Sequence, residues 1–109
     1  MNMNTEHASK LFESLASPTR LAIFQALTAE GGRGMVAGDL AKQLNLAPNN
    51  LSFHLKTLAN ANLVYSEQQG KFVRYFANLA MMNGLIEFLL HRCCENASGG
   101  DCEKFCQSC

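Results

Sequence analysis

The sequence predicts a single domain that is mainly α-helical and contains one small β-hairpin. Apolar residues recur at helical spacing through the first 60 residues and again after residue 78. Between these stretches, residues 63–78 are rich in β-forming side chains on both sides of Gln69-Gly70, a pair suited to a tight hairpin turn. Two short helices in tandem, followed by a two-stranded ribbon, indicate a winged helix-turn-helix.

Two helices are predicted in the first 30 residues. Leu11, Phe12 and Leu15 form one apolar turn and a half. Ser17 and Pro18 then start a second helix as its N-cap and first residue. The apolar residues of this second helix follow at helical spacing until the loop at Gly31–Gly34: Leu21, Ile23, Phe24 and Leu27.

Residues 36–46 and 47–63 predict the two tandem helices. Leu40 and Leu44 point inward from the first of them. In the second, Pro48 marks the helix start, and the inward face consists of Leu51, Leu55 and Leu58. The residues that point more or less outward from this second helix are Asn49, Asn50, Ser52, Phe53 and Lys56.

A last helix is predicted from Asn78, its N-cap, to about Arg92. Its apolar residues fall on two neighbouring faces. One face, which could cover the domain's own core, contains Met81, Leu85 and Phe88. The other alternates steps of three and four, a pattern suited to packing against a second copy of the same helix, and contains Leu79, Met82, Ile86, Leu89 and Cys93.

Nine basic and nine acidic residues give a formal net charge of zero, but they are unevenly distributed. Residues 47–75 carry three basic residues and one acidic residue, whereas residues 93–109 carry three acidic residues and one basic residue. The N-terminal segment MNMNTEHASK has no apolar stretch typical of a signal peptide, and LAMMNGLIEFLL is too short to span a bilayer. We therefore expect a cytoplasmic protein without a membrane partner, whose thiols stay reduced.

Three motifs follow one another within roughly residues 11–90: LASPTRLAIFQAL, GDLAKQLNLAPNNLSFHLKTLANANLV and GKFVRYFAN. In the order and spacing of these motifs, the sequence resembles the ArsR/SmtB repressors, small dimeric winged-helix metalloregulators of bacteria. It implies that the helix from Pro48 to Ala59 enters the major groove of operator DNA and that the hairpin is the wing. It also implies a homodimer formed by the first and last helices, which releases DNA when an inducer binds.

Two departures from the family concern the inducer site. The segment GMVAGDL has no cysteine where many arsenic-responsive members carry a pair, and the last helix offers only Glu87 and His91 to a metal. The resemblance therefore points to residues 93–109, a cysteine-rich tail that follows a DNA-binding and dimerisation domain at residues 1–92. A subgroup of arsenic-responsive relatives carries an adjacent cysteine pair and a third cysteine shortly after it, and Cys93, Cys94 and Cys102 match that arrangement.

The chemistry of the tail favours the same interpretation. All five cysteines lie in residues 93–109, and thiolates prefer soft ions to Mg²⁺ or Ca²⁺. Adjacent cysteines suit an ion that needs few ligands, such as trivalent arsenic, which binds three sulfurs in a pyramid. Gly99-Gly100 allows the segment between Cys94 and Cys102 to fold back at a small entropic cost.

Other uses of the cysteines remain open. Cys102, Cys106 and Cys109 have the spacing of zinc ligands, so the inducer could instead be Zn²⁺, Cd²⁺ or an oxidant. Cys93 alone could be a small buried apolar residue. A third alternative is a thiol-based metal-sequestering protein, whereas catalysis is not expected because no cofactor motif accompanies the thiols.

The candidate DNA contacts lie on the helix that starts at Pro48 and on the hairpin. Asn49, Asn50 and Ser52 could hydrogen-bond base edges or phosphates, and asparagine pairs best with adenine. The candidate phosphate contacts are Lys56, Lys71 and Arg74, with a half-buried His54 and Arg20 as further candidates. Phe53 stands where many relatives have arginine, and Ala47 stands where a serine or threonine would cap the helix.

Together these observations predict a homodimeric repressor of a metalloid-resistance operon that requires no cofactor. Its expected inducer is trivalent arsenic bound by Cys93, Cys94 and Cys102, with antimony or methylated arsenic as chemically similar alternatives. Cys106 and Cys109 are additional candidate ligands.

Overall fold

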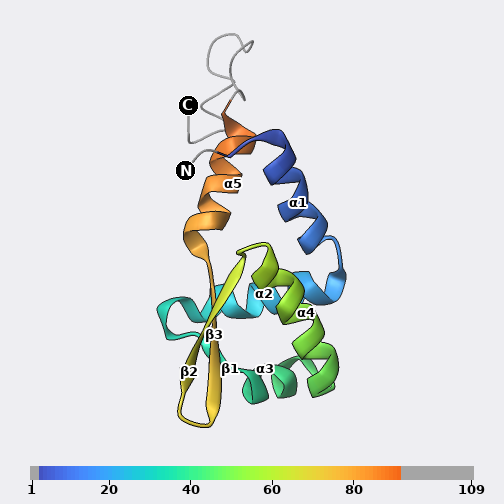
Figure 1. Ribbon diagram of the computed structural model, residues 1–109, viewed down its shortest axis with the longest axis vertical. Coiled ribbons are helices and arrows are strands. Elements are labelled where there is room, and N and C mark those ends of the chain that lie inside the picture. Colours follow the sequence, from blue (N-terminus) through green and yellow to red (C-terminus); the bar gives the residue numbers. More distant parts are fainter. Residues whose placement is uncertain (1–2, 92–109) are drawn as a thin grey trace.

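The computed structural model of the chain describes residues 3–91 (Figure 1). It confirms the predicted winged helix-turn-helix, in which helices predominate and a small sheet lies at one end. The elements, in chain order, are α1 (Thr5–Leu15), α2 (Pro18–Glu30), a 3₁₀ turn (Gly31–Arg33), β1 (Met35–Val36), α3 (Ala37–Leu44), α4 (Pro48–Asn60), β2 (Val64–Gln69), β3 (Phe72–Ala77) and α5 (Leu79–Leu90). None of these helices is long and apolar enough to cross a membrane.

The sheet has three antiparallel strands in the order β1-β3-β2. The predicted two-stranded ribbon corresponds to β2 and β3 and lacks β1. The hairpin itself is as expected, with Gln69 paired to Phe72 and Gly70 at a φ of 63° in the turn. The added strand β1 pairs Met35 with Tyr75 and directly follows the predicted loop, which forms a 3₁₀ turn. A strand of two residues has no alternation of apolar and polar side chains, so no pattern in the sequence marks it.

Gly34 allows β1 to approach β3 closely. Its φ of +62° is in the left-handed region, and a Cβ atom there would lie 2.5 Å from the carbonyl oxygen of Tyr75 and 2.6 Å from the ring of Phe76. Glycine at this position thus fixes the junction between the turn and the sheet.

The core is centred on α2, which buries Ile23, Phe24, Ala26 and Leu27. Leu21 is exposed, contrary to the apolar stripe predicted for this helix. It lies about 120° around the helix from Leu27, at the edge of the buried face. The largest fully buried side chains outside α2 are Leu11, Leu40, Leu51, Leu55, Leu58, Leu63 and Leu85.

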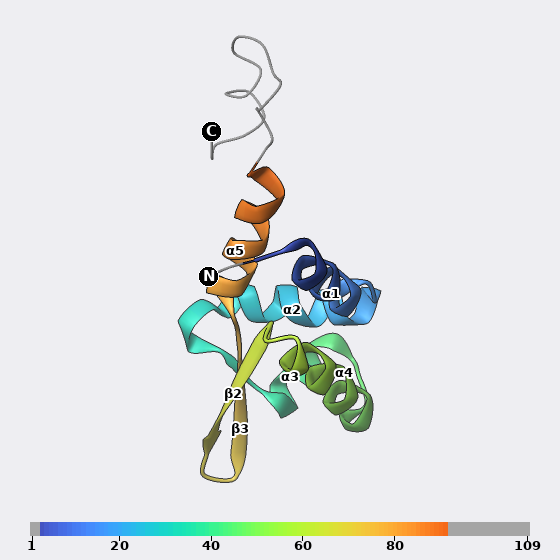
Figure 2. The same ribbon diagram turned by 45° about the horizontal axis from the view of Figure 1, so that its top comes forward.

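The helices divide into two groups along the long axis of the molecule. α1 and α5 lie beside each other at one end, α3, α4 and the hairpin lie at the other, and α2 crosses between them (Figure 1). The turned view in Figure 2 shows α3 and α4 side by side beneath α1 and α2. α1 contacts α5, α2 and α4, so it joins the two ends of the domain.

Side chains cap the helices as predicted where the sequence offers them. The Ser17 hydroxyl accepts a hydrogen bond from the Arg20 N–H at 3.3 Å, and the Asn78 side chain accepts one from the Met81 N–H at 3.1 Å. α1 begins at Thr5 because Asn4 caps it. α5 ends at Leu90, and the predicted end at Arg92 lies outside the described residues.

Candidate nucleic-acid interface

A tight turn joins α3 to α4. Asn45 adopts the left-handed conformation at a φ of 54°, which asparagine tolerates better than most residues. The Leu46 N–H donates to the Ala41 carbonyl at 2.9 Å, and this bond closes the end of α3. The chain then enters α4 at Pro48, so α4 packs against α3 through Leu51 and presents its other side outward.

The candidate base contacts Asn49, Asn50 and Ser52 and the candidate phosphate contact Lys56 are all exposed on α4. Asn49, Asn50, Ser52 and Lys56 lie outside the buried leucine face, as their spacing predicts. Together they form a polar surface on the helix that the tandem arrangement leaves uncovered. Side-chain amides, hydroxyls and ammonium groups are the groups that contact base edges and phosphates in protein–DNA complexes.

His54 and Arg20, from different helices, are brought together by the structure. Arg20 Nη1 lies 3.4 Å from His54 Nδ1, and Arg20 Nε donates to the Ser14 carbonyl at 2.6 Å. Both side chains are half-buried, as the sequence predicts for His54. Since arginine can only donate, a hydrogen bond between these two atoms has His54 Nδ1 as its acceptor.

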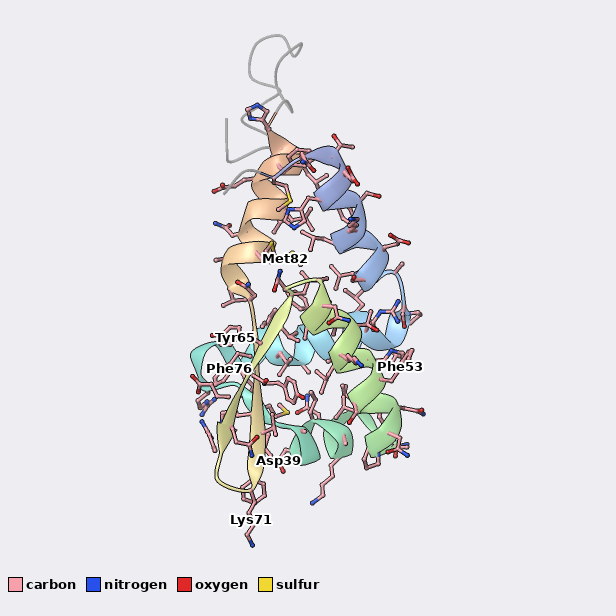
Figure 3. All side chains as sticks on the ribbon, viewed as in Figure 1. Asp39, Phe53, Tyr65, Lys71, Phe76 and Met82 are labelled. Carbon is pink, nitrogen blue, oxygen red and sulfur yellow. The ribbon has the colours of Figure 1, made fainter. Side chains whose placement is uncertain are left out.

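The two basic residues of the hairpin differ in their surroundings. Lys71 is exposed and extends from the tip of the hairpin (Figure 3). Arg74 is half-buried: Nη1 donates to the Arg33 carbonyl at 3.0 Å and Nε donates to Gln69 Oε1 at 2.9 Å. The first of these bonds ties the wing to the turn that precedes β1. Arg74 therefore braces the wing, and Nη2 is the guanidinium nitrogen that makes no hydrogen bond within residues 3–91.

α5 separates its apolar residues much as predicted. Met81 and Leu85 are buried in the core, whereas Leu79, Ile86 and Leu89 are 49%, 46% and 55% exposed. We call the three exposed residues the apolar seam. Met82, predicted to lie with them, is half-buried and packs against the domain's own core. Cys93, the fifth residue of the predicted face, lies outside the described residues.

The candidate inducer ligands Cys93, Cys94, Cys102, Cys106 and Cys109 all lie outside the described residues. Within residues 3–91, no three histidine, cysteine, aspartate or glutamate side chains gather closely enough to hold a metal ion. Glu87 and His91 are both exposed on α5 and at its end.

Phe53 is a candidate site residue that the sequence marks only as a replacement for arginine. It is 67% exposed in the middle of α4, on the outer side of the helix away from the hairpin (Figure 3). The available signal was its position, two residues from both Leu51 and Leu55, which places it opposite the buried face.

Known proteins similar to this chain share its architecture. A sequence family described as a helix-turn-helix domain matches residues 15–67. The arsenical resistance operon repressor of Bacillus subtilis (strain 168) is 36% identical over 93 residues, which cover 84% of this chain and 85% of that protein. The transcriptional repressor SdpR of the same organism is 29% identical over 83 residues, covering 76% of this chain and 89% of the relative.

A solved structure supports the same relationship. The ArsR-like transcriptional regulator from Rhodococcus sp. RHA1 superposes with a TM-score of 0.72 at 28% sequence identity. The match covers 83% of this chain and 82% of that one.

Proposed function

Because this chain belongs to the ArsR family of winged helix-turn-helix regulators, we propose that it represses a metalloid-resistance operon and is released by trivalent arsenic or antimony. Members of this family are DNA-binding transcriptional regulators. The chain is accordingly a DNA-binding transcriptional repressor and not an enzyme. The proposal concerns its inducer, the residues that bind that inducer and the homodimer that responds.

The observation that carries the proposal is the concentration of all five cysteines directly after α5, in residues 93–109. In a family of DNA-binding regulators, such a cluster gives this chain a place to bind a soft ion. Residues 3–91 offer no competing group of three metal ligands. The 36% identity to a repressor named for arsenical resistance supports the same inducer.

The ligands we propose are the thiols of Cys93, Cys94 and Cys102. Arsenous acid exchanges each of its three hydroxyl groups for a thiol, so three As–S bonds form and three water molecules leave. The seven residues 95–101 separate the adjacent pair from the third cysteine. Closing so short a loop costs little entropy, and the glycine pair within it can adopt backbone conformations that other residues rarely adopt.

α5 provides a route from the thiols to the DNA-binding residues. Cys93 comes two residues after His91, whose N–H donates to the Phe88 carbonyl at 3.3 Å at the end of the helix. α5 packs against α1, and α1 in turn contacts α4. A change in the position of α5 would therefore be transmitted to the helix that carries Asn49 and Asn50.

The homodimer we propose forms through the apolar seam of α5 together with α1. Leu79, Ile86 and Leu89 are large aliphatic side chains that the monomer leaves in water, and Phe12 on α1 is 44% exposed as well. Burying such residues against a second copy removes apolar surface from solvent. Two copies joined at α1 and α5 would each present one α4 to successive turns of DNA, roughly 34 Å apart.

Fluorescence anisotropy of the full-length, reduced protein on the DNA that precedes its own gene tests the inducer. Arsenite and antimonite should release the DNA, with an affinity loss of about 5–150-fold for a typical allosteric coupling. Replacing Cys102 with serine should leave DNA binding intact and abolish release. The matched control is Cys109→Ser, which changes the same chemical group in the same tail and should respond like the unmodified protein.

Release by Zn²⁺ or Cd²⁺ alone would contradict the proposal. The spacing of Cys102, Cys106 and Cys109 would then identify the inducer site, and Cys109→Ser would fail to respond as Cys102→Ser does. Loss of DNA binding in Cys102→Ser would contradict the separation between the inducer site and the DNA-binding surface.

A further inference from the structure

We propose that Phe53 is a specificity-determining residue, whose ring contacts the C5-methyl group of a thymine in the major groove of the operator. This inference rests on DNA binding by α4 and is independent of the metalloid chemistry proposed for the cysteines. It assigns an apolar contact to a surface that otherwise carries amides, a hydroxyl and an ammonium group.

The position of Phe53 on α4 is the first argument. The helix buries Leu51, Leu55 and Leu58, and Phe53 lies about 200° around the helix from Leu51. It is 67% exposed, more than any other large apolar side chain in residues 3–91. Asn49 and Lys56 lie on the same outer side, one turn before and one turn after it. Phe53 is thus at the centre of the surface that α4 presents to DNA.

The second argument is that a contact to the neighbouring residue orients the ring. The rings of Phe53 and His54 pack edge to face, with centroids 5.6 Å apart and an interplanar angle of 76°. Arg20 of α2 contacts His54 Nδ1 and donates a hydrogen bond to the Ser14 carbonyl of α1. The histidine on α4 is therefore held in place by contacts from α2 and, through Arg20, from α1. Phe53 is therefore supported on one side, while its other side remains free for a partner.

The third argument is chemical. A phenyl ring has no hydrogen bond to offer a phosphate or a polar base edge, so its contact with most of the groove would leave polar groups unsatisfied. The methyl group of thymine is the apolar group that unmodified base pairs present in the major groove, and phenylalanine is one of the side chains that contact it. Placing Phe53 against that methyl group removes apolar surface of both partners from water.

Thymine can be replaced by uracil, which differs only in lacking this methyl group. Two versions of the DNA that precedes the gene, one made with thymidine and one with deoxyuridine, are bound to the full-length reduced protein in the absence of metalloid. We expect the deoxyuridine version to bind about fourfold more weakly for each contacted methyl group that is removed, the equivalent of burying one methylene. Phe53→Ala should bind both versions equally.

Phe72→Ala is the matched control, because Phe72 is 60% exposed on the hairpin and the substitution is identical. This variant should still prefer the thymidine version as strongly as the unmodified protein does. A preference that persists in Phe53→Ala would come from DNA shape and would overturn the inference, as would equal binding of both versions by the unmodified protein. If the unmodified protein bound neither version of the DNA, both this inference and the proposed function would be overturned.

Discussion

α4 and α5 have the same design on their inner sides and opposite chemistry on their outer sides. Each buries apolar side chains against the core, Leu51 and Leu55 in α4 and Met81 and Leu85 in α5. The outer side of α4 carries amides, a hydroxyl and a lysine around the single ring of Phe53, whereas the outer side of α5 carries Leu79, Ile86 and Leu89. An exposed polar helix face suits the grooves and phosphates of DNA, and an exposed aliphatic face suits another protein surface.

The helix N-termini divide in a related way. Side chains cap α1, α2 and α5, through Asn4, Ser17 and Asn78. α3 and α4 begin after Val36 and Ala47, which make no such bond. The two helices of the helix-turn-helix thus keep N–H groups of their first turns free of side-chain partners, although capping is usually worth about 1 kcal/mol per helix. A free helix N-terminus is also a favourable place for a phosphate group.

The largest effect is expected from a charge in the apolar seam. Ile86→Asp places a carboxylate in the proposed dimer interface, and the residue's 46% exposure means that the monomer should tolerate it. A monomer engages a single half-site, so the affinity for DNA should fall by about 100-fold or more through reduced avidity. Sedimentation would measure the oligomeric state, and anisotropy the affinity.

Phe72→Asp is the control for this substitution, since it introduces the same charge at an exposed apolar residue of the hairpin. It should sediment as the dimer. If Ile86→Asp also remained a dimer, the apolar seam of α5 would not be the dimer interface, and the contrast between the two helices would need another explanation.

An intermediate effect is expected on the polar side of the comparison. Lys56→Ala removes an exposed ammonium group from α4 and should weaken binding to all DNA sequences similarly. The slope of log affinity against log salt should decrease by about 0.9 for each phosphate that the variant no longer neutralises. Lys10→Ala, on the exposed surface of α1, should leave the slope unchanged. Equal slopes for all three proteins would exclude Lys56 from the phosphate-binding surface.

Much of this comparison could be predicted from the sequence, because periodicity and capping residues act locally. The buried and exposed faces of α4 follow from the spacing of Leu51, Leu55 and Leu58, and Ser17 and Asn78 mark two helix starts. Periodicity failed where a residue lies between two faces, as Leu21 and Met82 do. In such cases the neighbouring helix decides the burial, and the spacing within one helix does not contain that information.

Some features of the site depend on tertiary contacts between distant residues, and the sequence could not predict these. Arg20 and His54 are 34 positions apart, and only the crossing of α2 and α4 brings them to 3.4 Å. Arg74 was predicted as a phosphate contact from its charge, but its hydrogen bond to the Arg33 carbonyl depends on β1, which the sequence pattern does not reveal. The predicted roles of the cysteines and of the DNA contacts stay predictions.

The smallest effect tests the uncapped start of α4. Ala47 has the extended backbone of an N-cap, with φ −64° and ψ 141°, but no side-chain oxygen to accept from the first-turn N–H groups. Ala47→Ser supplies that oxygen and should raise the free energy of unfolding by about 1 kcal/mol, measured by urea denaturation. Ser17→Ala is the matched reverse change, because it removes the 3.3 Å bond to the Arg20 N–H and should lower stability by a similar amount.

If serine at position 47 adds stability but weakens DNA binding, the hydroxyl and the DNA compete for the same N–H groups, and the missing cap serves the interface. If stability rises and DNA binding is unchanged, the start of α4 makes no phosphate contact, and the contrast with the capped helices has no part in DNA binding.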